Sequence, residues 1–249
     1  MTSATGAKAR TKRTKSRLAL WNGERGWRRT TRRVFIVVVV FLLAPVPVIL
    51  LFSVVQPPTT SVMMQRTVQR LVEGDRPVWP RHTTVSRAEL SPNLRRAVLA
   101  SEDDRFYLHH GIDFVEVRNA LQRRKAGGKL RGASTLTQQV AKNLFLWNGR
   151  SFVRKGLEAY VAVWLELILS KERILDLYLN LAEWGDGIFG AESASRAYFN
   201  KSAKELTREE AARLAAILPS PRRWSPTGSI ATRRAAIYLE RMQYAAPKP

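Results

Sequence analysis

The sequence contains no cysteine, three histidines, and 20 acidic against 42 basic residues. Without cysteine, structural disulfides, thiolate metal sites and a catalytic thiol are all excluded. The histidines occur in no H-E-x-x-H string or comparable acidic spacing, so nothing in the sequence supports a metal site. The shortage of acids leaves a net charge of +22, which predicts an anionic partner, either nucleic acid or an anionic membrane surface.

Charge is missing altogether from the 22 residues Val34–Val55. As a helix this stretch is about 33 Å long, enough to cross a hydrocarbon core of roughly 30 Å. It is too long for the apolar region of a signal peptide, and no small-x-small cleavage site follows it. Eleven Lys and Arg precede it, with Glu24 as the only acid, so the positive-inside rule keeps the N-terminus in the cytoplasm. We therefore expect a basic cytoplasmic tail at 1–33, a transmembrane signal anchor at 34–55, and an extracytoplasmic remainder that does not meet nucleic acid.

The rest of the chain lacks sustained two-residue alternation and internal repeats, and its apolar residues recur at helical spacing. We expect a stalk or linker at 56–84, a mainly α-helical domain at 85–241 and a C-terminal tail at 242–249. Within the domain, the strongly apolar segment Phe152–Leu169 is expected to be the buried central helix.

Polar and charged residues are concentrated in three short clusters, at a density that a helix does not need for folding. The string E-D-x-x-F-x-x-H-x-G occupies Glu102–Gly111, G-x-S-T-x-T-Q-Q-x-x-K-N occupies Gly132–Asn143, and R-K-x-x-E occupies Arg154–Glu158. A carboxylate that takes up a proton, beside cations that hold an anionic leaving group, suits glycosyl or phosphoryl transfer. One such cluster alone is equally well explained as a solvated helix face, but three in order favour a catalytic site.

Each cluster has a structural as well as a chemical interpretation. Glu102 is expected near a helix C-terminus, where three consecutive acids interact unfavourably with the helix dipole. Neighbouring carboxylates and partial burial raise the pKa of its carboxyl and make it a better base. The second cluster enters a helix N-terminus, whose N–H groups and the Ser134 and Thr135 hydroxyls suit an anion. In the third, Arg154 and Lys155 precede Glu158 by four and three residues, the spacing of ordinary intrahelical salt bridges.

Together with later strings, these clusters resemble the glycosyltransferase domain of class A penicillin-binding proteins, family fifty-one of the glycosyltransferases. The chain is similar, more closely, to the monofunctional biosynthetic peptidoglycan transglycosylases. The resemblance covers Val85 to Arg241. Besides the three clusters, it includes Ile174–Asn180, Gly190–Glu192 with Tyr198 and Phe199, and Glu209–Ala215. The departures are Ala133 where glycine is common, Leu136 for isoleucine, and Asp176 for glutamate, and none removes a reacting group.

The resemblance implies a lysozyme-like helical fold that polymerises lipid II into β-1,4-linked glycan strands and releases undecaprenyl diphosphate, as part of peptidoglycan synthesis. Glu102 would be the general base that deprotonates the acceptor 4-hydroxyl. Glu158 matches the second glutamate, whose implied role is positioning or assistance at the leaving pyrophosphate. The remaining matched positions are expected to bind substrate: Ser134 and Gln139 in the cleft, and Lys142, Arg150 and Lys155 at the pyrophosphates.

The resemblance also implies partners and a location. Lipid II, the growing glycan chain and membrane lipids are the expected partners, with other cell-wall synthesis or division proteins as candidates. The protein is expected to be single-pass in the bacterial inner membrane, with its catalytic domain in the periplasm. No cofactor is expected, although a divalent cation, Mg or Mn, is a candidate at the pyrophosphate. The basic stretch from Arg118 to Arg131, which contains apolar residues, corresponds to a partly membrane-embedded subdomain in the family.

Two other classes of function remain open. A lytic glycoside hydrolase of lysozyme-like fold needs an acid with a nucleophile or water-activating base, but not the three cations Lys142, Arg150 and Lys155 beside them. A non-enzymatic membrane scaffold gives no reason for the acid-amide-cation clusters. A penicillin-binding transpeptidase domain is not expected in a chain of 249 residues without an S-x-x-K tetrad.

Overall fold

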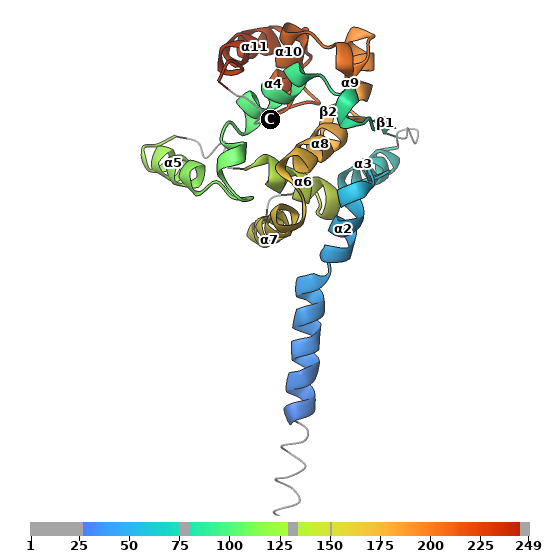
Figure 1. Cartoon of the computed structure of the whole chain (residues 1–249), viewed down its shortest axis with the longest axis vertical. Helices are drawn as coiled ribbons and strands as arrows, with labels where there is room; N and C mark the ends of the chain where they lie inside the picture. The colour runs from blue at the N-terminus through green and yellow to red at the C-terminus, as the bar shows by residue number, and fades with distance from the viewer. Residues whose placement is uncertain (1–26, 75–79, 129–133, 150, 245–249) are drawn as a thin grey trace, which may run out of the picture. The chain divides into compact units, whose positions relative to one another are not determined.

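A computed structural model of the chain describes residues 27–74, 80–128, 134–149 and 151–244 (Figure 1). It divides into two compact units, Met1–Val48 and Ile49–Pro249. The described elements are mainly helical, as the sequence predicts: α2 Val46–Val54, α3 Ser61–Val72, β1 Arg81–His82, η1 Arg87–Glu89, α4 Pro92–Glu102, η2 Phe106–Leu108, α5 Phe114–Lys125, α6 Leu136–Phe145, α7 Phe152–Ile168, α8 Lys171–Leu181, β2 Glu183–Gly185, β3 Ile188–Phe189, α9 Ala191–Phe199, η3 Ala203–Glu205, α10 Arg208–Ile217 and α11 Ser229–Arg241.

The candidate membrane span lies near the N-terminus, as expected. Helical residues run over the 28 residues Trp27–Val54, long and apolar enough by length and composition to cross a membrane. A turn at Ala44 and Pro45 interrupts them, because proline lacks the backbone donor and its ring clashes with the preceding turn. The chain therefore has one N-terminal apolar helix suited to anchoring it in a membrane.

The segment expected to be a stalk, 56–84, includes helix α3 and strand β1, which are part of the second unit. Helix α3 packs against α6, and the Gln65 side-chain amide donates to the Leu146 carbonyl at 3.1 Å. On the same helix, Arg66 pairs with Asp186 in the turn between β2 and β3. These contacts extend the folded region well ahead of residue 85.

Three very short strands form a sheet that the sequence does not predict. Strand β1 is parallel to β3, with Arg81 opposite Ile188 and His82 opposite Phe189, and β2 is antiparallel to β3. Strands of two or three residues are too short to show a two-residue alternation, which is why sequence patterning misses them.

The buried central helix is α8, not α7. Every residue of Ile174–Leu181 is buried. In α7 the apolar Phe152, Val153 and Leu167 are 98%, 73% and 70% exposed, so the expectation of a buried Phe152–Leu169 is wrong. Apolar composition indicates that a helix avoids water, but it does not distinguish a protein core from an apolar surface made for another environment.

Two groups of helices meet around this core. Helix α10 packs against α4 and α11, while α6 packs against α7 and α8. A buried ion pair, Arg95 to Asp176 at 3.0 Å, joins α4 to α8. The fully buried aromatic side chains Phe106, Trp184 and Phe189 fill the space between the elements. This arrangement places the end of α4 close to α6 and α8, where the candidate site lies.

Candidate active site

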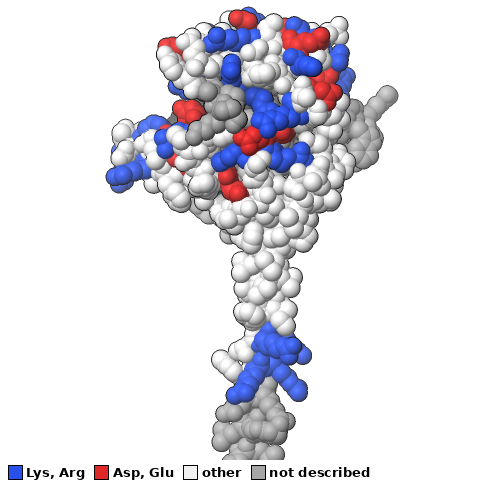
Figure 2. Space-filling view, viewed as in Figure 1, with Lys and Arg blue, Asp and Glu red and all other residues white. Residues whose placement is uncertain are grey.

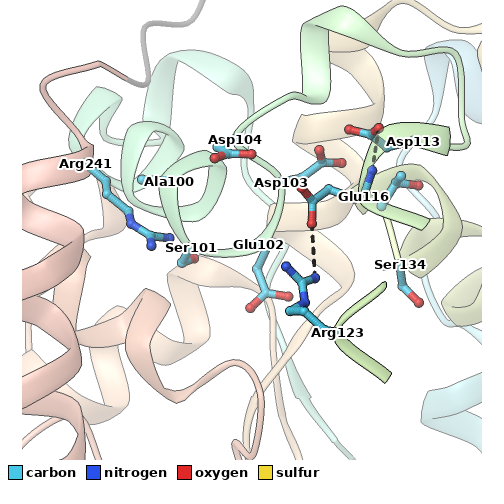
Figure 3. A pocket seen from close by; sticks show the side chains of 11 residues that line it. Ala100, Ser101, Glu102, Asp103, Asp104, Asp113, Glu116, Arg123, Ser134 and Arg241 are labelled. Atoms are coloured by element: carbon cyan, nitrogen blue, oxygen red, sulfur yellow. Dashed lines mark hydrogen bonds and ion pairs between the residues drawn. The ribbon is translucent and has the colours of Figure 1, made fainter. Parts of the chain in front are cut away.

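A pocket of about 310 Å³ opens beside the C-terminal end of α4. Glu102 is the last residue of α4, as the sequence predicts, and its side chain points into the pocket (Figure 3). The other lining residues come from the end of α4, from α5, from the segment that enters α6 and from α11: Ala100, Ser101, Asp103, Asp104, Asp113, Glu116, Arg123, Ser134, Thr135 and Arg241.

The Glu102 carboxyl is tuned by burial and by one specific hydrogen bond. Burial raises its pKa above the ordinary glutamate value, and Asp103 adds to this. The hydrogen bond from Gln139 and the charges of Arg234 and Lys142 act in the opposite direction. The Gln139 amide nitrogen donates to Glu102 Oε2 at 3.0 Å. A carboxylate with a raised pKa is a stronger base, and above that pKa it is ionised and able to accept a proton.

Asp103 has a structural role beside Glu102. Its carboxylate accepts hydrogen bonds from His109 Nε2 at 3.0 Å and from the backbone N–H of Leu136 at 2.9 Å. The Thr135 hydroxyl donates to the Gly111 carbonyl at 2.6 Å, and Gly111 has a φ of +83°, which glycine adopts without strain. These bonds tie the first sequence cluster to the start of α6. His109 therefore serves as a hydrogen-bonding residue.

The second and third clusters meet at the N-terminus of α6. Thr135 caps the helix and forms a capping box with Gln138. Lys155 Nζ, from α7, donates to Ser134 Oγ at 2.8 Å and lies 2.5 Å from Glu158 Oε1. A helix N-terminus with a hydroxyl and an ammonium group beside it is a suitable place for an anion.

Glu158 is held by two cations of its own helix. Arg154 Nη1 lies 2.8 Å from Glu158 Oε2, and Lys155 binds the other oxygen. The Glu158 side chain is 4% exposed and that of Arg154 is 12% exposed, so the predicted intrahelical pairs exist and are largely buried. With both oxygens engaged, Glu158 is the ion-pair partner of these two cations rather than a free carboxylate.

Lys142 extends this group of cations from the last turn of α6. Burial lowers its pKa, with Glu158 opposing that shift and the charges of Arg154 and Lys155 adding to it. On the face of the second unit shown in Figure 2, acidic and basic side chains gather in a band across its middle. Three cations around one glutamate give this group of side chains a net positive charge, which suits a ligand with two phosphates.

The structure brings together most of the residues that the sequence singles out. Glu102 with Gln139, and Ser134 with Lys155 and Glu158, are linked by hydrogen bonds, and Lys142 interacts with Glu102 and with Glu158. Arg150, expected at the pyrophosphates, lies outside the described residues. Among the residues that are described, no group of three or more His, Asp or Glu side chains could hold a metal ion.

Four charged residues at this site are not predicted from the sequence. Glu116 and Arg123 from α5 line the pocket and pair at 3.4 Å, and Arg241 from α11 lines it as well. Arg234, also on α11, lies against the rings of Trp224 and Tyr238 and lowers the pKa of Glu102. Helix α11 begins more than a hundred residues after Glu102, and nothing in its local pattern indicates which core face it covers.

Comparison with known proteins finds one consistent similarity. A family model described as Transglycosylase matches residues 67–243. A protein of Pseudomonas putida strain KT2440, named biosynthetic peptidoglycan transglycosylase, is 48% identical over 189 residues, covering 75% of this chain and 80% of the relative. A protein of the same name from Chromohalobacter salexigens is 49% identical over 183 residues, covering 74% of this chain and 76% of the relative. Another, from Xylella fastidiosa strain M12, is 54% identical over 137 residues, covering 55% of this chain and 56% of the relative.

Proposed function

Because the chain belongs to the transglycosylase family, we propose that it polymerises lipid II into β-1,4-linked glycan strands and that Glu102 is the general base. The observation that carries this proposal is the partly buried Glu102 carboxyl in a pocket close to clustered cations. Burial raises the pKa of Glu102, which strengthens it as a base. Negative charge develops on the leaving group only as it departs, and the cations bind that charge. They therefore stabilise the transition state more than the bound substrate, which is what accelerates a reaction.

The proposed reaction is one displacement at the donor sugar. Glu102 takes the proton of the acceptor 4-hydroxyl, and the acceptor oxygen forms a bond to C1 of the donor. The bond between C1 and the diphosphate oxygen breaks, and its electron pair leaves with undecaprenyl diphosphate. Lys142 and Lys155, with Arg150 as a further candidate, face the departing negative charge. Glu158 keeps Lys155 and Arg154 in place, since its two oxygens bind them.

The test of this function compares two substrates with the purified full-length protein in detergent. With lipid II, polymerisation lengthens glycan chains and releases lipid diphosphate. Preformed glycan strands, supplied alone, should stay unchanged. Shortening of those strands without consumption of lipid II would instead identify a lytic hydrolase, and no reaction with either substrate would support a scaffold. The same assay with and without a chelator tests whether a divalent cation takes part, which stays a prediction.

The catalytic domain is proposed to face the periplasm from a single-pass anchor in the inner membrane, because the basic residues precede the apolar helix. An alkaline phosphatase fused after Pro249 is therefore expected to be active in intact cells. The matched control, the same enzyme fused after Arg33 ahead of the span, is expected to be inactive. Activity of the second fusion but not of the first would contradict this topology.

Membrane lipids are proposed to contact α5, whose apolar and basic residues are exposed together. Phe114 and Leu121 are 74% and 51% exposed, and Arg118, Arg124 and Lys125 are exposed on the same helix. Replacing these three cations with glutamine is expected to weaken binding to anionic liposomes at low salt, with a smaller difference at high salt. Arg123 is left unchanged because it lines the pocket.

The control for this experiment removes the same charge elsewhere. Arg87, Arg96 and Lys204 are exposed on other elements, and their replacement by glutamine should weaken liposome binding much less. Equal losses in the two triple variants would show that total charge alone governs binding and would remove the assignment to α5.

A further inference from the structure

Behind Glu102 and Gln139 lies a buried tyrosine that the proposed reaction does not yet use. Tyr178 belongs to α8 and is 1% exposed. Its hydroxyl donates to Gln139 Oε1 at 3.4 Å, while Gln139 Nε2 donates to Glu102 at 3.0 Å. The three side chains thus form a short hydrogen-bonded chain from the core helix α8, through α6, to the end of α4.

The 3.4 Å contact is long for a hydrogen bond between oxygens. Hydrogen bonds around catalytic groups are often long in the free enzyme and shorten when substrate is bound. Burial raises the pKa of the Tyr178 hydroxyl well above its ordinary value, and the nearby Glu102 and Asp103 carboxylates add to this. The hydroxyl is therefore neutral at any physiological pH, and it keeps the proton that it donates.

A glutamine amide has a donor end and an acceptor end, and a half-turn exchanges them. With Nε2 towards Glu102, the amide stabilises the ionised carboxylate. With Oε1 towards Glu102, it would accept a hydrogen bond from the neutral acid and so stabilise the protonation state that cannot act as a base. A donor placed at the far end of the amide selects the first orientation, and Tyr178 is such a donor.

We propose that Tyr178 is a positioning residue, which fixes the orientation of the Gln139 amide so that its nitrogen faces the Glu102 carboxylate. It touches neither substrate nor the reacting atoms and acts only through Gln139. This inference rests on the proposed role of Glu102 as base and adds to it a specific means by which the fold keeps that base ionised.

The expected consequence is a change in pH dependence. A general base must be ionised, so the rate falls on the acid side of its pKa. The charged and titratable groups around Glu102 are Asp103 and Asp104 at the end of α4, Lys142 on α6, Tyr178 on α8, Arg234 and Arg241 on α11, and Glu116 and Arg123 on α5. Removal of the neutral Tyr178 hydroxyl changes none of their charges, so a shift in the acid limb reports the amide.

The experiment measures the rate of lipid II polymerisation against pH for the full-length Tyr178→Phe variant. A hydrogen bond to an ionised group moves its pKa by about one unit. We expect the acid limb to move to higher pH by about that amount, a roughly tenfold lower rate at any pH on the limb, with little change in the alkaline plateau. An unchanged acid limb would overturn the proposal.

Two further variants separate positioning from a general structural effect. Tyr107 provides a matched control, because its buried hydroxyl has no hydrogen-bond partner among the described residues, and Tyr107→Phe should leave the limb in place. In a Gln139→Met background the amide is gone, so adding Tyr178→Phe should cause no further shift. A shift of the same size in that background would show that Tyr178 does not act through Gln139.

A spectroscopic titration keeps the result independent of catalysis. Infrared difference spectra of the parent, with Glu102→Gln to identify the signal, follow the Glu102 carboxyl directly. Tyr178→Phe is expected to raise the pH at which this signal changes, and no change would overturn the proposal even if that variant were inactive. If Glu102→Gln itself polymerises lipid II normally, the proposed base is wrong. If Glu102→Gln is inactive but Tyr178→Phe does not shift the pH at which the Glu102 signal changes, only the positioning role of Tyr178 is wrong.

Discussion

Replacement of Glu102 by glutamine is expected to lower the rate of lipid II polymerisation by about 10²–10⁴, the usual contribution of a positioned general base. Glutamine keeps the size of the side chain and its place in the pocket but has no carboxylate to take the acceptor proton. Lipid II binding should persist, because the cations that are proposed to hold the diphosphate lie on α6 and α7. The measurement is the initial rate at saturating lipid II, together with the dissociation constant.

Glu116 provides the matched control for this substitution. It is an acid that lines the same pocket, from α5, and it pairs with Arg123. Glu116→Gln also removes one carboxylate and should retain most of the activity. If Glu102→Gln worked at nearly the parental rate, or if the two variants lost activity equally, the assignment of the base to Glu102 would be wrong.

Replacement of Glu158 by alanine is expected to destabilise the fold as well as reduce activity. It leaves the Arg154 guanidinium, whose side chain is 12% exposed, without its partner in a mostly buried position. Breaking a buried ion pair from one side costs about 3–5 kcal/mol. Urea-induced unfolding of the variant and of the parent measures this loss, and the midpoint should fall without a large change in slope.

A second ion pair with the same four-residue spacing shows whether burial is the cause. Arg196 pairs with Glu192 on α9, but its side chain is 60% exposed. Arg196→Ala is therefore expected to cost less than about 1 kcal/mol. Similar losses from Glu158→Ala and Arg196→Ala would contradict the view that Glu158 neutralises a buried cation.

Much of the site follows from local sequence rules. The end of α4 at Glu102 and the pairing of Arg154 and Lys155 with Glu158 depend on neighbours within one helix turn or one helix, where spacing determines geometry. The capping residue Thr135 at the start of α6 follows from the same local rules. The helix end and the ion pairs were predicted from the sequence, and the structure confirms both, whereas Thr135 was not predicted as the cap.

The rest of the site depends on how helices pack, which local patterns do not encode. Gln139 and Glu102 meet across 37 positions of sequence, and Tyr178 joins them from a third helix. Arg234 acts on Glu102 from α11, at the far end of the domain sequence. The apolar run of α7 predicted burial, yet Phe152 is 98% exposed, because hydrophobicity specifies what a side chain avoids but not which apolar surroundings it meets.

The anomeric configuration of the product tests the central claim most directly. A hydroxyl activated by Glu102 attacks C1 from the side opposite the leaving diphosphate, so a single displacement inverts that centre. Retention would require a carboxylate nucleophile and a covalent intermediate, and both oxygens of Glu158 are already bound to Arg154 and Lys155. Nuclear magnetic resonance of the donor and of the glycan made by the purified full-length protein compares the two configurations. Opposite configurations are predicted, and the same configuration in donor and product would contradict a direct displacement with Glu102 as its base.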